Sequence, residues 1–476
     1  MLRYLVWKIL KKYIIFAAAL CGLIIMPACA ETLSFNSFLE TALQNSYKLK
    51  ASKIDSGIAK AGVKEARAGY FPTLSGYATT ERYNDLSDGN RQITAVGNEI
   101  LLNRDYYQDV AAVGLNYNLF DFGIRKRNLE IAKADDKQKE ALLLKDTRDL
   151  KLDVVDLYGE TLTLYKALGI KREILGLQNE LFTIYKRLRF AGELSEIELT
   201  NSEIDISETK SDIVELENSL SKRLTEFSYY TNKSYGIDDV EIEDFDEDFE
   251  SGVVPVNVIA NNQQKHSNQE KESAKLSAEK SSIENESNFD IEKSLEAKTY
   301  DLEILKKQKE YEIQKRANFP KISFDTRYNL YGSDSDKYFD SFSDIEQRSL
   351  SFRISTSFTL FDGFKNVNTV QKRKMEVEKL KIQKEQEMAE LKKKYEQIRL
   401  DAKNSVSQNE NNKRTLKLVN KNLENLERLN ANGIIAKAEC VKKKLELLDK
   451  KQKLEETRIR HYIAGYKLGV LNNIIE

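Results

Sequence analysis

The side chains that could perform chemistry in this chain are few and widely separated. The 476 residues contain two histidines, His266 and His461, and three cysteines. Neither histidine has partners at the spacing of a metal site, and no phosphate-binding loop, nucleophile elbow or paired-cysteine motif occurs. The abundant acidic residues are spread along stretches typical of solvated helix faces. The sequence therefore predicts no catalytic residue, no metal site and no cofactor, and we do not expect an enzyme.

The composition favours long, solvated helices. Charged residues make up 32% and hydrophobic ones 41%, with 4 prolines. Abundant Glu and Lys with scarce proline is typical of extended helices rather than of a compact α/β enzyme. The formal net charge of −1 gives no bulk field that would attract nucleic acid, so we expect no nucleic-acid partner.

The N-terminus is typical of a secretion signal, at 1–30. Basic residues precede an apolar core at 13–26, which is short for a membrane-spanning helix. The small residues around Ala30 fit a cleavage site, so the signal is expected to be removed near it. A retained anchor and a lipidated Cys29 are the alternatives. Cleavage leaves Cys440 as the remaining cysteine, so no internal disulfide is expected.

The string Leu-Phe-Asp occurs twice, with its phenylalanine at Phe120 and at Phe361. A Phe-Pro pair precedes each copy, and the glycines Gly192 and Gly433 follow at the same offset. Landmarks that recur in the same order indicate an internal duplication. The predicted division is a signal peptide at 1–30, a first repeat at 31–236, a linker at 237–290 and a second repeat at 291–476.

Between Phe-Pro and Leu-Phe-Asp, apolar and polar residues alternate, as in strands with two different faces. Each stretch has about 10 residues, enough for a tilted strand to cross a bilayer. We therefore predict membrane hairpins at 73–119 and 321–360, in contact with outer-membrane lipid. A half-buried hairpin in a soluble domain is the alternative. Because four strands cannot close a pore and open edges are not tolerated in lipid, the chain should oligomerise.

Each Leu-Phe-Asp copy is predicted to be a strand–helix junction. The phenylalanine would lie at the membrane interface, the aspartate would cap the following helix, and the glycine would let the chain bend. These residues are Phe120, Asp121, Gly123, Phe361, Asp362 and Gly363.

Long helical hairpins are predicted after both junctions. The runs 124–190 and 365–431 contain no proline, and apolar residues follow heptad spacing in both. A continuous helix of this size would reach about 100 Å. The tip glycines end these runs, and amphipathic returns follow at 196–229 and 437–471.

The order and doubling of these landmarks resemble the TolC family of outer-membrane efflux proteins over nearly the whole mature chain. The resemblance implies a mixed α and β fold: a homotrimer whose chains share a twelve-stranded β-barrel, extended by a periplasmic α-barrel. It further implies a periplasmic adaptor protein and an inner-membrane transporter of the RND or ABC type as partners. The expected function is the exit duct of a tripartite efflux or type I secretion system, located in the outer membrane.

The resemblance also implies a periplasmic entrance, because family members place acidic side chains just past the second tip glycine. Glu439 lies six residues past Gly433, and Glu198 six past Gly192. Three copies would form carboxylate rings suited to a cation-sensitive gate. A solvated helix face is the alternative. Lys442 is one of several lysines that add positive charge where the family often has an acid, which weakens the anionic character of the entrance.

The hairpin tips resemble the family's adaptor contact. Gly192-Glu193-Leu194-Ser195 matches an Arg-Leu-Ser contact, with Glu in place of Arg. The corresponding stretch of the second repeat is Gly433-Ile434-Ile435. Adaptor docking at both tips is the resulting hypothesis.

Three matters stay open at the level of the sequence. The linker at 237–290 is polar and partly acidic, typical of a disordered or loosely packed segment that could girdle the helices, and has no predicted function. A periplasmic adaptor or a secreted coiled-coil structural protein are the rival classes. The first would not need two membrane-length hairpins, and the second would lack alternating strands. Drug efflux and protein secretion are not distinguished.

Overall fold

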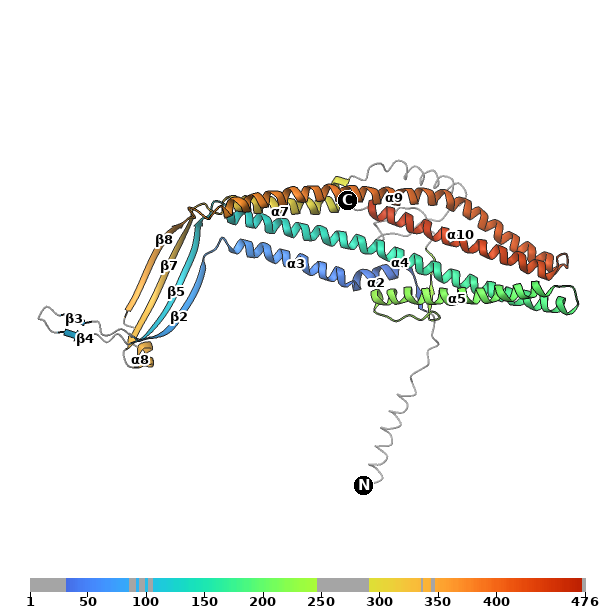
Figure 1. Cartoon of the computed structure of the whole chain (residues 1–476), viewed down its shortest axis with the longest axis horizontal. Helices are drawn as coiled ribbons and strands as arrows, with labels where there is room; N and C mark the ends of the chain where they lie inside the picture. Colours follow the sequence, from blue (N-terminus) through green and yellow to red (C-terminus); the bar gives the residue numbers. More distant parts are fainter. Residues whose placement is uncertain are drawn as a thin grey trace, which may run out of the picture. The chain divides into compact units, whose positions relative to one another are not determined.

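The computed structural model describes a mostly helical chain, at residues 31–84, 91–93, 99–101, 106–245, 291–334, 337–343 and 347–472 (Figure 1). The strands are β1 (Glu31–Leu33), β2 (Thr73–Tyr83), β3 (Arg91–Ile93), β4 (Glu99–Leu101), β5 (Tyr106–Phe120), β6 (Val240–Ile242), β7 (Lys321–Asp334) and β8 (Gln347–Ser357). The helices are α2 (Phe35–Asn45), α3 (Tyr47–Ala68), α4 (Ile124–Phe190), α5 (Glu196–Thr231), α7 (Leu295–Lys315), α8 (Tyr338–Ser343), α9 (Lys365–Ala431) and α10 (Lys437–Asn472). The predicted signal, most of the predicted linker and His266 lie outside the described residues.

The described residues form two compact units, and each unit draws on both halves of the sequence. Unit 1 takes residues 31–50, 146–245 and 392–472, and unit 2 takes the described parts of 51–145 and 291–391. Each of the helices α4 and α9 contributes one part to unit 1 and another part to unit 2. The predicted repeats therefore divide the sequence, whereas each compact unit combines corresponding parts of the two repeats.

A four-stranded antiparallel sheet lies in unit 2, in the order β2-β5-β7-β8 (Figure 1). The pairs β2–β5 and β7–β8 are the two predicted hairpins. The central pair β5–β7 joins the first half of the sequence to the second, from Tyr107 opposite Asp334 to Phe120 opposite Ile322. The edges of this sheet are β2 and β8.

The strand ends differ from the predicted ones for physical reasons. The prediction continued the last strand to Leu360, but β8 ends at Ser357, opposite Lys321. The residue before Lys321 is Pro320, which has no N–H to donate to a ladder, so Phe358 leaves the sheet. Within the second predicted hairpin, β7 continues to Asp334, and the short helix α8 lies between β7 and β8.

The sheet has two chemically different faces, because side chains of paired residues point to the same side. We define the apolar face by Leu74, Val113, Leu115, Phe324, Tyr328, Leu350, Phe352 and Ile354. We define the polar face by Thr73, Ser75, Glu81, Asn116, Lys321, Ser323, Asp325, Arg327, Asn329, Ser349, Ser351, Arg353 and Ser355. On the apolar face, Leu74 and Ile354 are 73% and 70% exposed. On the polar face, side chains bond across strands: Asn329 Nδ2 donates to Ser349 Oγ at 3.0 Å.

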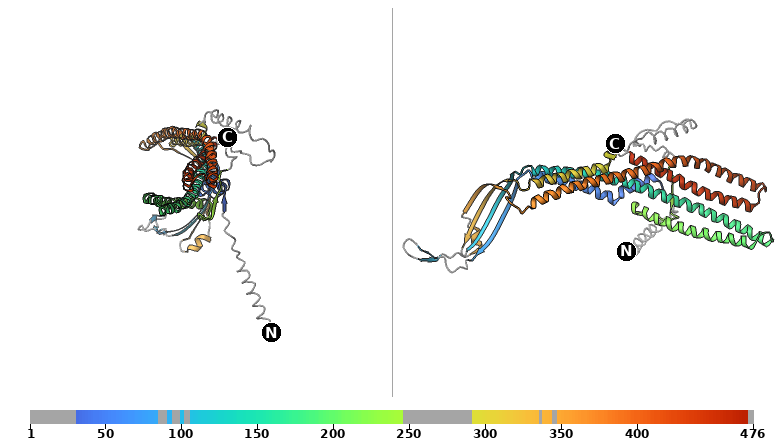
Figure 2. Two further views of the ribbon diagram at one scale, coloured as in Figure 1. Left: turned by 90° about the vertical axis from the view of Figure 1, so that its right-hand side faces the viewer. Right: turned by 45° about the horizontal axis from the view of Figure 1, so that its top comes forward.

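The long helices coincide with the predicted runs. The bounds of α4 and α9 are the predicted ones, and their returns α5 and α10 extend slightly beyond 229 and 471 (Figure 2). The helices α2, α3 and α7, which precede the strands, were not predicted. Among the described residues, no helix combines the length and the apolarity that crossing a membrane requires.

The core of unit 1 is an aromatic cluster under a small parallel sheet of β1 and β6. Phe38 stacks on Phe227 at 4.0 Å between ring centroids, and both are almost completely buried. Tyr158 is fully buried, and its hydroxyl lies 2.9 Å from Leu33 O and 2.7 Å from Glu243 O. The first residues of the predicted linker thus form a strand in this core, which corrects the prediction of loose packing for them.

Replacing Tyr158 by phenylalanine is expected to destabilise unit 1 by about 1–2 kcal/mol, because a buried carbonyl oxygen loses its donor. Circular dichroism of the detergent-solubilised protein would show a lower thermal midpoint. The matched control is Tyr229→Phe, whose side chain belongs to a residue that is 58% exposed. Equal midpoints for the two variants would contradict the structural role of the Tyr158 hydroxyl.

Candidate functional site

Both strand–helix junctions, in unit 2, are held by an aspartate at the start of a long helix. Asp121 is 5% exposed, and its Oδ2 accepts from Arg125 N at 3.1 Å and from Arg125 Nε at 2.9 Å. Asp362 Oδ2 accepts from Asn366 N at 2.9 Å. These bonds satisfy an N–H that the first helical turn leaves without a partner and place a negative charge at the helix N-terminus. Each strand therefore changes to a helix at a fixed residue.

The bend at each junction uses two consecutive residues in the left-handed region. In the first junction these are Phe122 and Gly123, with φ of 53° and 79°. In the second they are Gly363 and Phe364, with φ of 66° and 65°. The order of glycine and phenylalanine is reversed between the two. The sequence predicts the two glycines at the junctions but not the two phenylalanines, although each phenylalanine directly adjoins a predicted glycine.

Aromatic contacts support these unusual phenylalanines. The Phe122 ring lies 4.7 Å from that of Phe120 and 5.1 Å from that of Phe319, both edge-on. The Phe364 ring lies 5.5 Å from that of Phe361. Phe120 and Phe361 are 49% and 72% exposed, and their position at a membrane interface stays a prediction.

The tips of the helical hairpins, in unit 1, end in the same motif. Gly192 and Gly433 have φ of 78° and 67°. In the first tip, Glu193 N donates to Leu188 O at 2.9 Å and Gly192 N to Arg189 O at 3.1 Å. The second tip repeats both bonds, with Ile434 N to Leu429 O at 3.0 Å. This pattern is a Schellman motif, in which glycine supplies the left-handed residue after the helix.

The predicted gate carboxylates lie in the first turn of the returning helices. Ser195 caps α5 and accepts from Glu198 N at 3.2 Å, so Glu198 is the third residue of that helix. Glu439 is the third residue of α10, although Ala436 offers no capping side chain there. Both carboxylates are exposed and lie near the positive end of a helix, which stabilises them locally.

The side chain of Lys442 is affected by the negative charges of Glu198 and Glu439. Its ammonium lies 5.5 Å from the centre of the Tyr185 ring. A hydrogen bond with Tyr185, and more weakly the charges of Glu198 and Glu439, raise the pKa of Lys442 above its usual value. Of the predicted gate residues, Lys442 thus responds to the charge of both carboxylates, and their role in a gate stays a prediction.

The predicted adaptor-contact residues divide into packed and exposed ones. Leu194 packs against the cluster of Leu181, Tyr185 and Val441, which fixes α10 against α4. Ile434 is 68% exposed and Ile435 is half-buried. Two further apolar side chains near the tip are exposed although the sequence does not single them out: Phe190 is 96% and Ile197 73% exposed.

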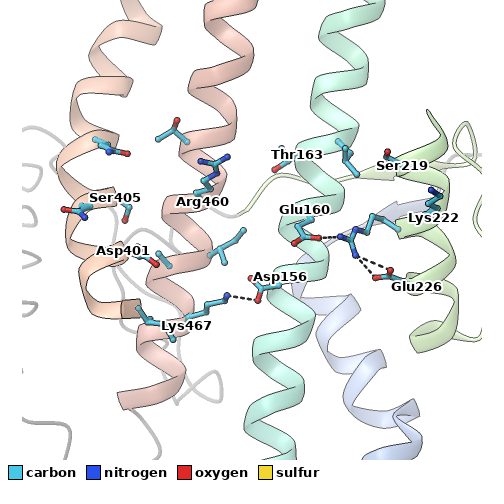
Figure 3. Close-up of a pocket in the computed structure, with 18 residues that line it drawn as sticks. Asp156, Glu160, Thr163, Ser219, Lys222, Glu226, Asp401, Ser405, Arg460 and Lys467 are labelled. Carbon is cyan, nitrogen blue, oxygen red and sulfur yellow. Dashed lines mark hydrogen bonds and ion pairs between the residues drawn. The ribbon is translucent and has the colours of Figure 1, made fainter. Parts of the chain in front are cut away.

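A charged cavity of about 1140 Å³ lies in unit 1, and α4, α5, α9 and α10 all line it (Figure 3). Acidic and basic side chains alternate around it: Asp156, Glu160, Glu226 and Asp401 against Lys222, Arg223, Arg460 and Lys467. Ion pairs join Arg223 to Glu160 and Lys467 to Asp156, each at 2.6 Å. The sequence analysis did not identify this cavity, because its residues come from four separate helices.

Potential chemistry near the cavity is limited. His461 is buried, and its Nδ1 lies 3.0 Å from Ser405 Oγ. The Ser405 hydroxyl also lies 2.7 Å from the Ala402 carbonyl, which can accept its proton. In the part of the chain that the structure describes, no group of three His, Cys, Asp or Glu side chains could hold a metal ion.

The described residues combine a four-stranded sheet that has one apolar face with two helical hairpins that end at glycines, as expected for a protein of the outer-membrane channel class. The chain belongs to the family of outer membrane efflux proteins, the TolC family, whose sequence model matches residues 38–230 and 298–465. No curated protein matches the sequence.

Solved structures share the fold over almost the whole chain. CusC is 15% identical and superposes with a TM-score of 0.66, covering 92% of this chain and 91% of its own. VceC from Vibrio cholerae is 12% identical with a TM-score of 0.66, covering 92% and 95%. The CmeC outer membrane channel of Campylobacter jejuni is 14% identical with a TM-score of 0.63, covering 91% and 86%. At these identities the likeness establishes the fold.

Replacing Gly363 by alanine is expected to destabilise unit 2 by about 1–2 kcal/mol, because a Cβ strains the left-handed backbone. No atom lies within 4 Å of the added carbon, so strain alone is tested. Gly57→Ala in α3, also without a near neighbour, is the matched control and should stabilise by about 0.5–1 kcal/mol. Thermal midpoints that move in the same direction would contradict the assignment.

Proposed function

We propose that this chain forms the exit duct of an efflux or type I secretion system, as a homotrimer in the outer membrane. The observation that carries the proposal is the sheet, which combines an exposed apolar face with two unpaired edges, β2 and β8. Backbone groups at an open edge cannot be left without partners in lipid. Pairing between copies removes both edges.

The strand directions favour a closed ring. Successive neighbours in the sheet are antiparallel, so β8 of one copy and β2 of the next would also be antiparallel. Such a contact uses two different surfaces and closes only at a particular copy number. Membership of the TolC family supports three copies, which would give a twelve-stranded barrel.

The helical hairpins would continue the duct into the periplasm. In a trimer, Glu198 and Glu439 would form rings at the entrance, and Lys442 would moderate their negative charge. The tip residues Gly192, Leu194, Ser195, Gly433, Ile434 and Ile435 would contact a periplasmic adaptor protein. That adaptor would join the duct to an inner-membrane transporter of the RND or ABC type. A signal peptide cleaved near Ala30 would direct the chain to this location.

The first test is the molar mass of the protein extracted by detergent from the outer-membrane fraction. Light scattering corrected for bound detergent should give three times the mass of the processed chain. A monomer in the soluble periplasmic fraction would contradict the channel proposal and favour an adaptor or a coiled-coil structural protein.

The second test addresses the tips. Replacing Gly192 and Gly433 together by a bulky residue should reduce cross-linking to the adaptor, because both Schellman turns and the residues after them are displaced. Gly57→Ala, far from the tips along the sequence, is the control and should keep wild-type cross-linking. Unchanged cross-linking of the double variant, in trimers of normal mass, would count against docking there.

A further inference from the structure

The polar face of the sheet carries more basic than acidic side chains. Lys321, Arg327 and Arg353 lie on it, and we call these three residues the basic belt. The acidic residues of the same face are Asp325 and Glu81. All three side chains of the basic belt belong to exposed residues, and none forms an ion pair with a described residue.

The local surroundings of the basic belt leave its charges available. Arg327 lies opposite Gly114 in β5 and Ser351 in β8, which offer no charge. Arg353 lies opposite Asp325, whose carboxylate accepts from Asn116 Nδ2 and offsets part of the Arg353 charge. Most neighbours on this face are serine, threonine or asparagine, so they add hydrogen-bonding capacity without adding charge.

The remaining charges of the strands do not offset this excess. Four further charged residues of the sheet lie on the side of the apolar face, namely Arg82, Asp109, Asp334 and Arg348. The Asp109 carboxylate is 6% exposed and accepts from Thr80 Oγ1 and Ser341 Oγ, each at 2.6 Å. It is therefore held between β2, β5 and α8 rather than presented to the polar face.

We propose that the basic belt makes the strand-lined part of the duct prefer anionic solutes. This rests on the proposed function, because it requires the polar face to line the pore. In a barrel the polar side chains face the lumen, and lumen charges tune selectivity. Rings of Arg or Lys are the usual basis of anion preference. Since charges are screened beyond about 8 Å at physiological salt, the preference should be strongest in dilute electrolyte.

The test is the reversal potential of trimers in planar bilayers under a potassium chloride gradient, at low salt. Glu198→Gln/Glu439→Gln serves as the background, so that the tip carboxylates do not impose their own selectivity. Chloride should be more permeant than potassium. Adding Arg327→Gln and Arg353→Gln should lower the permeability ratio of chloride to potassium to one or below. Increasing salt should reduce the difference.

The matched control is Arg348→Gln, on the same strand as Arg353 but on the opposite face. It should leave the permeability ratio unchanged. If the double arginine variant yields no trimers, Arg327→Gln alone carries the test, because Arg327 has no charged partner across either neighbouring strand.

The outcomes separate the two proposals. The anion preference is overturned, but the duct is not, by either of two results. The trimers conduct but prefer potassium, or their permeability ratio is unchanged by Arg327→Gln and Arg353→Gln. An equal effect of Arg348→Gln overturns the assignment of the polar face to the lumen. Trimers of the correct mass that never conduct overturn the duct, and the anion preference with it.

Discussion

The backbone of this chain has to change from a strand ladder to a helix within a few residues, and it does so twice. Asp121 and Asp362 fix where α4 and α9 begin, because each accepts a hydrogen bond from an N–H of the first helical turn. Asp121 directly follows the last residue of β5, whereas residues 358–361 separate the end of β8 from Asp362. Two left-handed residues then precede each helix and turn the chain into it.

The elements that the sequence predicts well are those limited by local residues. The bounds of α4 and α9 follow from the absence of proline and from glycines that can end a helix in a left-handed turn. By contrast, the end of β8 depends on Pro320, which directly precedes the neighbouring strand β7. The strand β6 pairs with β1, which lies about 200 residues earlier in the sequence. The helix α8 depends on Ser341 reaching Asp109. Such contacts between distant segments leave no periodic signal.

The candidate site shows the same distinction. Glu198 and Glu439 could be located by their distance from a glycine, but their place at the third position of a helix gives them a local role as well. Phe122 and Phe364 escaped prediction because a bulky residue rarely adopts a positive φ. The charged cavity could not be predicted because four separate helices supply its lining. The exposure of Phe190 at the tip could not be predicted because exposure depends on packing rather than on residue type.

The central ladder between β5 and β7 has a consequence for how the protein is made. The Asn116 and Asp325 side chains that meet across it are separated by 209 residues in the chain. During synthesis the first hairpin therefore emerges long before its main partner, and contacts at such separation form slowly. The four-stranded sheet is complete only after β8, which ends at Ser357 in a chain of 476 residues. Both helices of the first hairpin, α4 and α5, precede that point in the sequence.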